Sequence, residues 1–199
     1  MKKTFLICFF IGIVVFQAQA QNTQDLTWDL QLLKGGQREP LPRSQSITVE
    51  SGQEVFIVVS PSTDCFCYII SQNSERKLFI LHDQPVRGER KVRVNPLQED
   101  KSPGEKTLYV IMSLVRQTKL EDFIKSYKGD LNSQMYADNM QGELAKLQET
   151  ASGLGEPARA LVTTGGTTRG GEAEEGERVI ATRFSGKNMY VRTVTIRTR

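Results

Sequence analysis

The stretch "EVFIVVSPSTDCFCYIIS" (residues 54–71) decides the fold class, because it holds two apolar runs of strand length separated by a short turn. Residues 54–60 are almost continuously apolar and β-branched, which is typical of a central strand buried on both faces. Pro61 to Asp64 form turn material, and residues 65–71 provide a second run that is expected to return beside the first. The stretch therefore predicts two consecutive strands of a buried sheet.

Similar short runs recur on both sides of this stretch, with turn residues between them. They occupy residues 26–33, 46–50, 77–81, 90–94 and 106–113, and Trp28 is the expected core anchor of the first. Regularly spaced short strands without helical insertions favour antiparallel pairing. We therefore expect residues 26–127 to form an antiparallel β-sandwich or an Ig-like barrel.

The hydrophobic period changes after residue 117. Thr118 and Glu121 have the spacing of a capping box, and Leu120, Phe123, Ile124 and Tyr127 follow at helical spacing. A helical extension is expected over residues 128–153, where Asp130 is the expected cap of a second helix. Its apolar stripe is expected to pack on the sheet and comprises Leu131, Met135, Met140, Leu144 and Leu147.

Residues 154–177 are rich in glycine and glutamate and contain few apolar side chains. Such a segment buries too little surface to offset its ordering entropy, so a flexible linker is predicted. Residues 178–199 hold two further β-type runs around "SGKN", which predicts a terminal β-hairpin. Since an isolated hairpin is marginally stable, we expect it to join the main sheet or a partner.

The first 20 residues have the pattern of a secretory leader. Lys2 and Lys3 precede an apolar run over residues 5–16, and the small-x-small tripeptide at 18–20 is typical of a signal-peptidase site. The apolar run is shorter than the roughly 20 residues that span a bilayer. We expect cleavage between Ala20 and Gln21 and a periplasmic or secreted bacterial protein that does not span the membrane.

The charge balance gives little support for a nucleic-acid partner. The full chain carries a formal net charge of +3, and removal of the two leader lysines leaves 24 basic and 23 acidic residues. A nucleic-acid-binding domain normally concentrates basic residues on one face. The expected partner is instead another envelope protein, or a glycan or peptide.

Cys65, Cys67 and His82 are the candidates for chemistry in the expected domain. Three ligands of a zinc site would require the fold to bring all of them together, and Cys-x-Cys is not the usual two-residue-spaced clamp. A disulfide between Cys65 and Cys67 would need a bulge or turn, because i and i+2 Cα atoms of a strand lie about 6.5–7 Å apart. The remaining interpretation is two thiols packed on one inward face. We predict no catalytic residue, metal or cofactor.

The polar connection after the cysteine strand is the candidate interaction tip. It comprises Gln72, Asn73, Ser74, Glu75 and Arg76. Loops that a rigid scaffold presents frequently carry binding residues. We therefore expect this tip to be a contact site.

The region over residues 26–127 resembles a bacterial family known as domain of unknown function 4384. The resemblance rests on Gly52 before the strand at 55–59, on Phe66 and Tyr68, on "LF" at 78–79, and on Pro103-Gly104-Glu105 before "LYVIMS". Cys65 and Cys67 depart from the small and apolar residues usual there, and "ILHDQP" replaces a Pro-Asn turn. The resemblance implies a small β-rich accessory module and assigns no catalytic residues.

The sequence therefore favours an exported, non-catalytic binding module of the bacterial cell envelope. Two alternatives remain at this point. One is a thiol-redox protein or enzyme that uses Cys65 and Cys67, and the other is a structural assembly component that uses its C-terminal hairpin.

Overall fold

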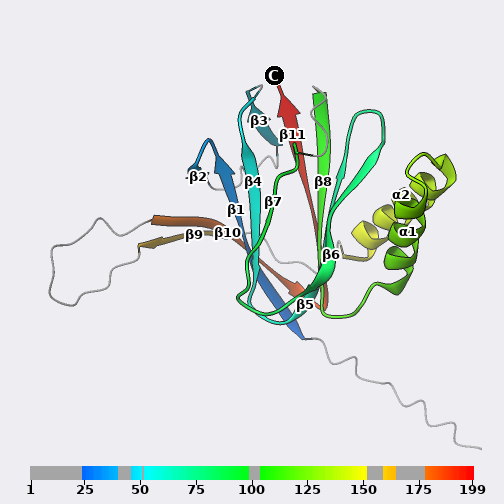
Figure 1. Ribbon diagram of the computed structural model, residues 1–199. Helices are drawn as coiled ribbons and strands as arrows, with labels where there is room; N and C mark the ends of the chain where they lie inside the picture. The colour runs from blue at the N-terminus through cyan, green and yellow to red at the C-terminus, as the bar shows by residue number, and fades with distance from the viewer. Residues whose placement is uncertain (1–23, 40–45, 51, 99–103, 152–158, 165–177) are drawn as a thin grey trace, which may run out of the picture.

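The computed structural model describes residues 24–39, 46–50, 52–98, 104–151, 159–164 and 178–199 (Figure 1). These residues form two β-sheets. The strands of the first sheet lie in the order β7 (Val92–Val94), β4 (Val55–Pro61), β1 (Asp25–Lys34), β10 (Arg178–Lys187) and β9 (Arg159–Thr164), with β2 (Gln37–Glu39) beside β1. Those of the second sheet lie in the order β3 (Ser46–Val49), β11 (Met189–Thr198), β8 (Gly104–Ser113), β5 (Cys65–Gln72) and β6 (Leu78–Val86).

The two sheets pack face to face, which confirms the predicted β-sandwich; both sheets are open, so the barrel alternative is not adopted. All pairings are antiparallel except that of β11 with β3. β4 and β5 differ from the expected neighbouring pair, because the turn at Pro61–Asp64 carries the chain from the first sheet to the second. The turn therefore joins the layers rather than two strands of one layer.

One core, which we name the inter-sheet core, lies between the layers and takes inward-facing residues from strands of both sheets. Trp28 is fully buried there, as predicted from the sequence. Its ring stacks on Phe184 with 4.5 Å between ring centroids and meets Tyr190 edge-on at 5.8 Å. The inter-sheet core comprises Leu26, Trp28, Leu30, Leu32, Ile47, Val49, Val55, Ile57, Val59, Cys65, Cys67, Ile69, Val86, Val92, Val94, Leu108, Val110, Met112, Phe184, Tyr190, Val194 and Ile196.

The outer face of β4 was expected to be buried beneath another layer, and no helix or sheet of the described residues covers it. Instead, Arg93 of the neighbouring strand β7 places its guanidinium 3.7 Å from the ring centroid of Phe56 on β4. The stem and planar head of an arginine can cover an aromatic ring while remaining in water. An apolar residue on this face is thus covered by a single long side chain.

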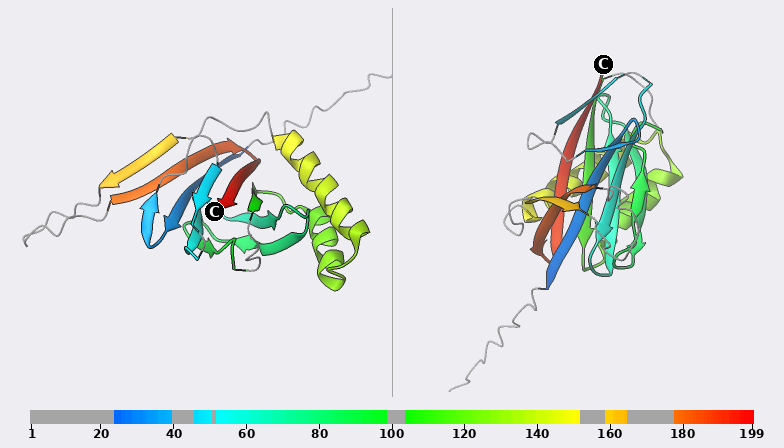
Figure 2. Two further views of the ribbon diagram at one scale, coloured as in Figure 1. Left: turned by 90° about the horizontal axis from the view of Figure 1, so that it is seen from above. Right: turned by 90° about the vertical axis from the view of Figure 1, so that its left-hand side faces the viewer.

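A second core, the helix-side core, lies on the outer face of the second sheet, under α1 (Thr118–Gly129) and α2 (Gln134–Ala151) (Figure 2). Both faces of β5 and β8 are therefore covered, which explains their nearly continuous apolar sequences. The helix-side core comprises Tyr68, Ile70, Leu78, Ile111, Leu120, Ile124, Tyr127, Ala137, Met140, Leu144, Leu147, Ala151 and Met189. The predicted helical extension therefore forms an integral third layer.

The helical stripe is confirmed at Met140, Leu144 and Leu147, which are buried. It is wrong at Leu131 and Met135, which are 54% and 61% exposed. Leu131 precedes α2, and Met135 lies in its first turn, away from the row of residues that faces the sheet. The apolar stripe therefore covers the sheet only from Ala137 onward.

The two C-terminal strands follow one another as the predicted hairpin requires, but they lie in different sheets. β10 pairs with β1 in the first sheet, and β11 pairs with β8 in the second. The link at Asn188, whose φ is +58°, therefore crosses between the layers. Both terminal strands therefore join the main domain. Of the two expected locations, the main sheet or a partner, the structure shows the first.

The predicted linker also differs from the structure in part. Residues Arg159–Thr164 form β9, because β10 offers them a ladder that the sequence alone does not reveal. The other residues of the 154–177 stretch, and the predicted leader, lie outside the described residues. Within the described part of the chain, neither helix has the length and hydropathy that crossing a bilayer demands.

Candidate functional site

The two thiols lie in the inter-sheet core and are not joined. Cys65 and Cys67 are both free and buried, and both face the first sheet from β5. This arrangement agrees with inward-packed thiols and is contrary to the alternative of a disulfide between them. Burial raises the pKa of Cys65 to about 11, with an added contribution from the charge of Asp64. The pKa of Cys67 is raised further, mainly by burial and to a smaller extent by the nearby Cys65.

These pKa values bear directly on the redox interpretation. The thiolate is the form that attacks disulfides and binds metals, and catalytic thiols have lowered pKa values. Both cysteines are shifted in the opposite direction. The strand thus holds two protonated thiols that act as small apolar side chains.

His82 lies on β6 opposite Ile69, beside a β-bulge that places Leu81 as an extra residue. It is partly buried, and its Nε2 has no hydrogen-bond partner among the described residues. Burial lowers the pKa of this imidazole, although a backbone hydrogen bond at Gln84 and the charge of Asp83 oppose the shift. No cluster of three or more metal-ligating side chains occurs in the described part of the chain.

The predicted interaction tip is ordered by its own hydrogen bonds and by α2. The Asn73 side-chain oxygen accepts hydrogen bonds from the backbone N–H groups of Glu75 at 3.1 Å and Lys77 at 2.9 Å. Arg76 has φ +64° and exchanges two hydrogen bonds with Gln141 of α2, one through its guanidinium and one through its carbonyl. The tip is therefore partly engaged within the molecule, although residues 74–76 remain exposed.

A groove of about 550 Å³ opens between α1 and the outer face of β5 and β6. We name it the α1 groove. Aromatic and proline rings come from the sheet, and three carboxylates and two cationic groups surround them. Its lining residues are Phe66, Asp83, Pro85, Arg116, Glu121, Asp122 and Lys125.

Strand alternation explains why the rings face this groove. Phe66 and Tyr68 alternate along β5 with Cys65 and Cys67, so the aromatic residues face the helices while the thiols face the other sheet. Pro85 lies opposite Phe66 on β6, and Asp83 lies opposite Tyr68. The groove therefore lies on the opposite face of β5 from Cys65 and Cys67.

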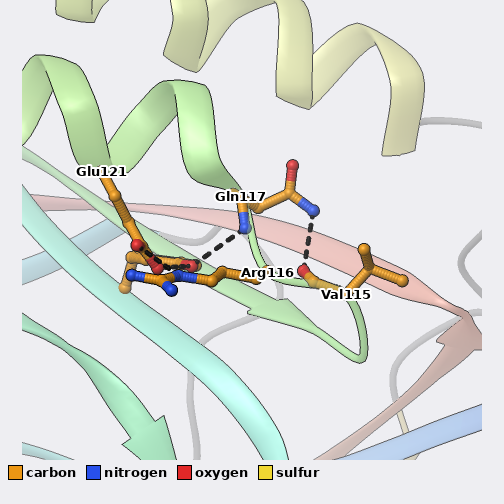
Figure 3. A network of polar contacts seen from close by, with 5 residues as sticks. Val115, Arg116, Gln117 and Glu121 are labelled. Carbon is orange, nitrogen blue, oxygen red and sulfur yellow. Dashed lines mark hydrogen bonds and ion pairs between the residues drawn. The ribbon is translucent and has the colours of Figure 1, made fainter.

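A polar network fixes the beginning of α1 (Figure 3). The Tyr68 hydroxyl donates to Glu121 Oε1 at 2.8 Å and accepts from the Gln117 backbone N–H at 3.1 Å. Arg116 Nε donates to Glu121 Oε2 at 2.7 Å, and Gln117 Nε2 donates to the Val115 carbonyl at 3.0 Å. Gln117 Nε2 also donates to Ser113 Oγ at 2.9 Å, so several connected hydrogen bonds hold the groove wall in one arrangement.

This network replaces the predicted capping box. Gln117 is the N-cap residue of α1 and makes no side-chain cap hydrogen bond, whereas Glu121 turns toward Tyr68 and Arg116. The buried tyrosine hydroxyl requires a hydrogen-bond partner in the low-dielectric helix-side core. Burial, the largest cause, also raises the pKa of Tyr68, and the neighbouring Glu121 adds to this rise. The sequence indicated Tyr68 as a strand residue but did not identify its partner 53 positions away.

The charges of the α1 groove fall into paired and unpaired groups. Arg116 pairs with Glu121, and Lys128 Nζ lies 2.7 Å from Asp83 Oδ2. Asp122 and Lys125 are exposed and have no ion-pair partner among the described residues. The groove therefore presents one free carboxylate and one free ammonium group above a ring-lined floor.

Comparisons of the chain with protein-family models, curated proteins and solved structures find no match. The resemblance to domain of unknown function 4384 stays a prediction, based on the short motifs quoted above.

Proposed function

We propose that this chain is an exported binding module of the bacterial cell envelope and that the α1 groove is its binding surface. One observation carries the proposal. Asp122 and Lys125, two charged side chains without ion-pair partners among the described residues, lie above a floor that contains Phe66 and Pro85. Partly exposed rings provide contact area, and the fixed charges provide orientation.

The partner that these features fit best is a protein segment with side chains of both charges. A basic side chain would pair with Asp122, an acidic side chain would pair with Lys125, and an apolar side chain would cover Phe66. The network of Tyr68, Glu121 and Arg116 supports this function, because a preorganised wall reduces the entropy cost of binding.

The raised pKa values of Cys65 and Cys67 favour binding over thiol-redox chemistry, since a protonated thiol is a poor nucleophile. His82 of β6 pairs with Ile69 of β5, which faces the inter-sheet core. The imidazole therefore lies on the opposite face of the sheet from the α1 groove and cannot act on a ligand there. The groove thus offers charges and rings but no activated nucleophile.

The test is capture of envelope proteins by the purified chain, followed by affinity measurement with the protein recovered. Lys125→Glu reverses the free cationic charge of the groove and is expected to weaken binding at least tenfold, or about 1.4 kcal/mol. Lys146→Glu is the matched control, because Lys146 is an exposed lysine of α2 outside the groove.

If wild type, Lys125→Glu and Lys146→Glu bound the partner equally well, the α1 groove would not be the binding surface. Failure of the wild-type chain to capture anything above a blank resin would contradict the binding function itself. Capture that survives protease treatment of the extract would identify a glycan and contradict the proposed protein partner. The export part of the proposal requires that the chain isolated from the bacterial envelope begin at Gln21, as determined by mass spectrometry.

A further inference from the structure

The two sheets of the described structure have four edges, and these differ in how they are protected. The first sheet ends at β7 and β9, and the second ends at β3 and β6; the three-residue β2, which pairs with β1, adds a short side edge to the first sheet. An edge strand presents free backbone N–H and C=O groups, so an unprotected edge is a template for another strand. Proteins protect such edges with short strands, prolines, bulges or charges.

Three of the four edges show such protection. β7 has only three residues, and β3 has only four. β6 is longer, but a bulge interrupts its ladder opposite Ile69 and Ile70, and Pro85 has no N–H group to donate. None of these three edges offers a long regular ladder.

The fourth edge, β9, lacks these features. Its six residues pair with Arg178–Arg183 of β10 in one uninterrupted register. The sequence "RALVTT" contains neither proline nor glycine, and its only charged residue is Arg159 at one end. β-branched residues such as its valine and threonines favour a strand.

The ribbon that β9 forms with β10 also lacks a third strand over part of its length. β1 pairs with β10 only over residues 182–187, so residues 178–181 pair with β9 alone. Figures 1 and 2 show this two-stranded ribbon extending away from the body of the sandwich. Two-stranded ribbons are marginally stable in water, whereas three or more strands are stable when they have a face to pack.

We propose that β9 pairs with β9 of a second copy of this chain, antiparallel and about a twofold axis, so that the first sheets of both copies become one continuous sheet. A twofold interface uses the same surface on both subunits, and β9 is the same length on each. The added strand gives the ribbon at residues 178–181 its third member.

Symmetry limits the register of this pairing. In an antiparallel pair about a twofold axis normal to the sheet, one residue lies opposite itself, because both copies of a residue must point to the same face. The centre of β9 allows this residue to be Leu161 or Val162. With either centre, the two copies of Arg159 do not lie opposite each other, so the pairing avoids a like-charge contact.

Cross-linking tests the register directly. Leu161→Cys and Val162→Cys are made separately in the chain from Gln21 onward and treated with a short bis-maleimide. Directly opposite Cβ atoms lie about 4.5–5.5 Å apart, so a covalent dimer is expected from one of the two variants. Cys65 and Cys67 are buried, and the cross-linking of the wild-type chain, which has only these thiols, gives the background level. Gln84→Cys, an exposed position on the protected β6 edge, is the matched control and is expected to stay monomeric on gels.

The strength of association is tested by analytical ultracentrifugation of the same chain. Leu161→Lys places a charge in the β9 edge and is expected to raise the dimer dissociation constant at least about tenfold, whereas Gln84→Lys leaves it unchanged. A wild-type chain that is monomeric at all concentrations overturns the proposal. Cross-linking at neither 161 nor 162, or equal effects of the two lysine variants, also overturns it, because the dimer would then use another surface.

Discussion

The two cores on either side of the second sheet differ in their polar content. The inter-sheet core receives inward-facing residues from both sheets, its cysteines act as apolar groups, and its buried Trp28 Nε1 has no hydrogen-bond partner among the described residues. The helix-side core contains the hydroxyl groups of Tyr68 and Tyr127, both of which have hydrogen-bond partners. The hydrogen-bonded Tyr68 of the helix-side core also holds the wall of the α1 groove, so this core both stabilises the fold and shapes the groove.

Removal of the largest ring from the inter-sheet core should have the largest effect on stability. Trp28→Ala leaves a cavity against Phe184 and Tyr190 and is expected to lower the free energy of unfolding by about 3–5 kcal/mol. Urea denaturation followed by circular dichroism measures this loss. A loss below about 1 kcal/mol would show that the two sheets do not depend on this ring cluster.

A hydroxyl deletion in the helix-side core should have the next largest effect. Tyr68→Phe removes both the donor to Glu121 and the acceptor of the Gln117 N–H group, and we expect a loss of about 2–3 kcal/mol. Tyr109→Phe is the control, because its hydroxyl makes one 3.3 Å hydrogen bond to Gln72, and about 1 kcal/mol or less is expected. Equal losses in urea denaturation would argue against a special role of the network at α1.

The opposite face of the same strand allows a test with cysteine. Cys67→Ser buries a hydroxyl in the inter-sheet core and is expected to cost about 1–2 kcal/mol, and Cys65→Ser less, because Cys65 is 4% exposed while Cys67 is fully buried. Thiol titration of the folded protein should be at least roughly 100-fold slower than that of the unfolded chain, since the raised pKa suppresses the thiolate. Rapid reaction of both folded thiols would restore the redox alternative.

The smallest expected effect is a pH dependence at His82, the only histidine of the chain. Burial lowers its pKa in the folded protein, so the unfolded chain binds a proton at higher pH than the folded one. Stability from this group is complete above the unfolded value of about 6.5 and falls as pH decreases through it. The slope is at most about 1.4 kcal/mol per pH unit.

Denaturation between pH 7.5 and 5.5 measures the contribution of His82, and His82→Gln is expected to flatten the curve. A wild-type curve without a slope, or a slope that persists unchanged in His82→Gln, would assign the pH dependence to other groups.

The sequence predicted the sandwich well because strand alternation and apolar runs are local signals. It placed Trp28 in the core and found the strands that contain residues 55–59 and 106–113. It did not predict that β4 and β5 lie in different sheets, because a short turn can join either neighbouring strands or opposite layers. Layer assignment depends on contacts between distant residues.

The candidate site was harder to predict for the same reason. Cys65 and Cys67 were noticed as unusual, whereas the groove lies on the opposite side of their strand, beside Phe66. Glu121 fitted a local capping pattern, but Tyr68 competes successfully for its carboxylate from a distant position. β9 was missed because its glycine-rich surroundings concealed a short strand that forms only beside β10.

The crossing of the last two strands between the sheets has a consequence for the timing of folding. β10 lies beside β1, and β11 lies between β3 and β8, so each sheet receives an interior strand from the final 22 residues. Asp25 finds its ladder partner in Lys187, and such distant pairing makes folding slow. A ribosome that has made only the first 150 residues therefore holds a chain whose two sheets each lack an interior strand. The sandwich can therefore close only after residues 178–199 have been added to the chain, and the earlier strands wait for these two partners.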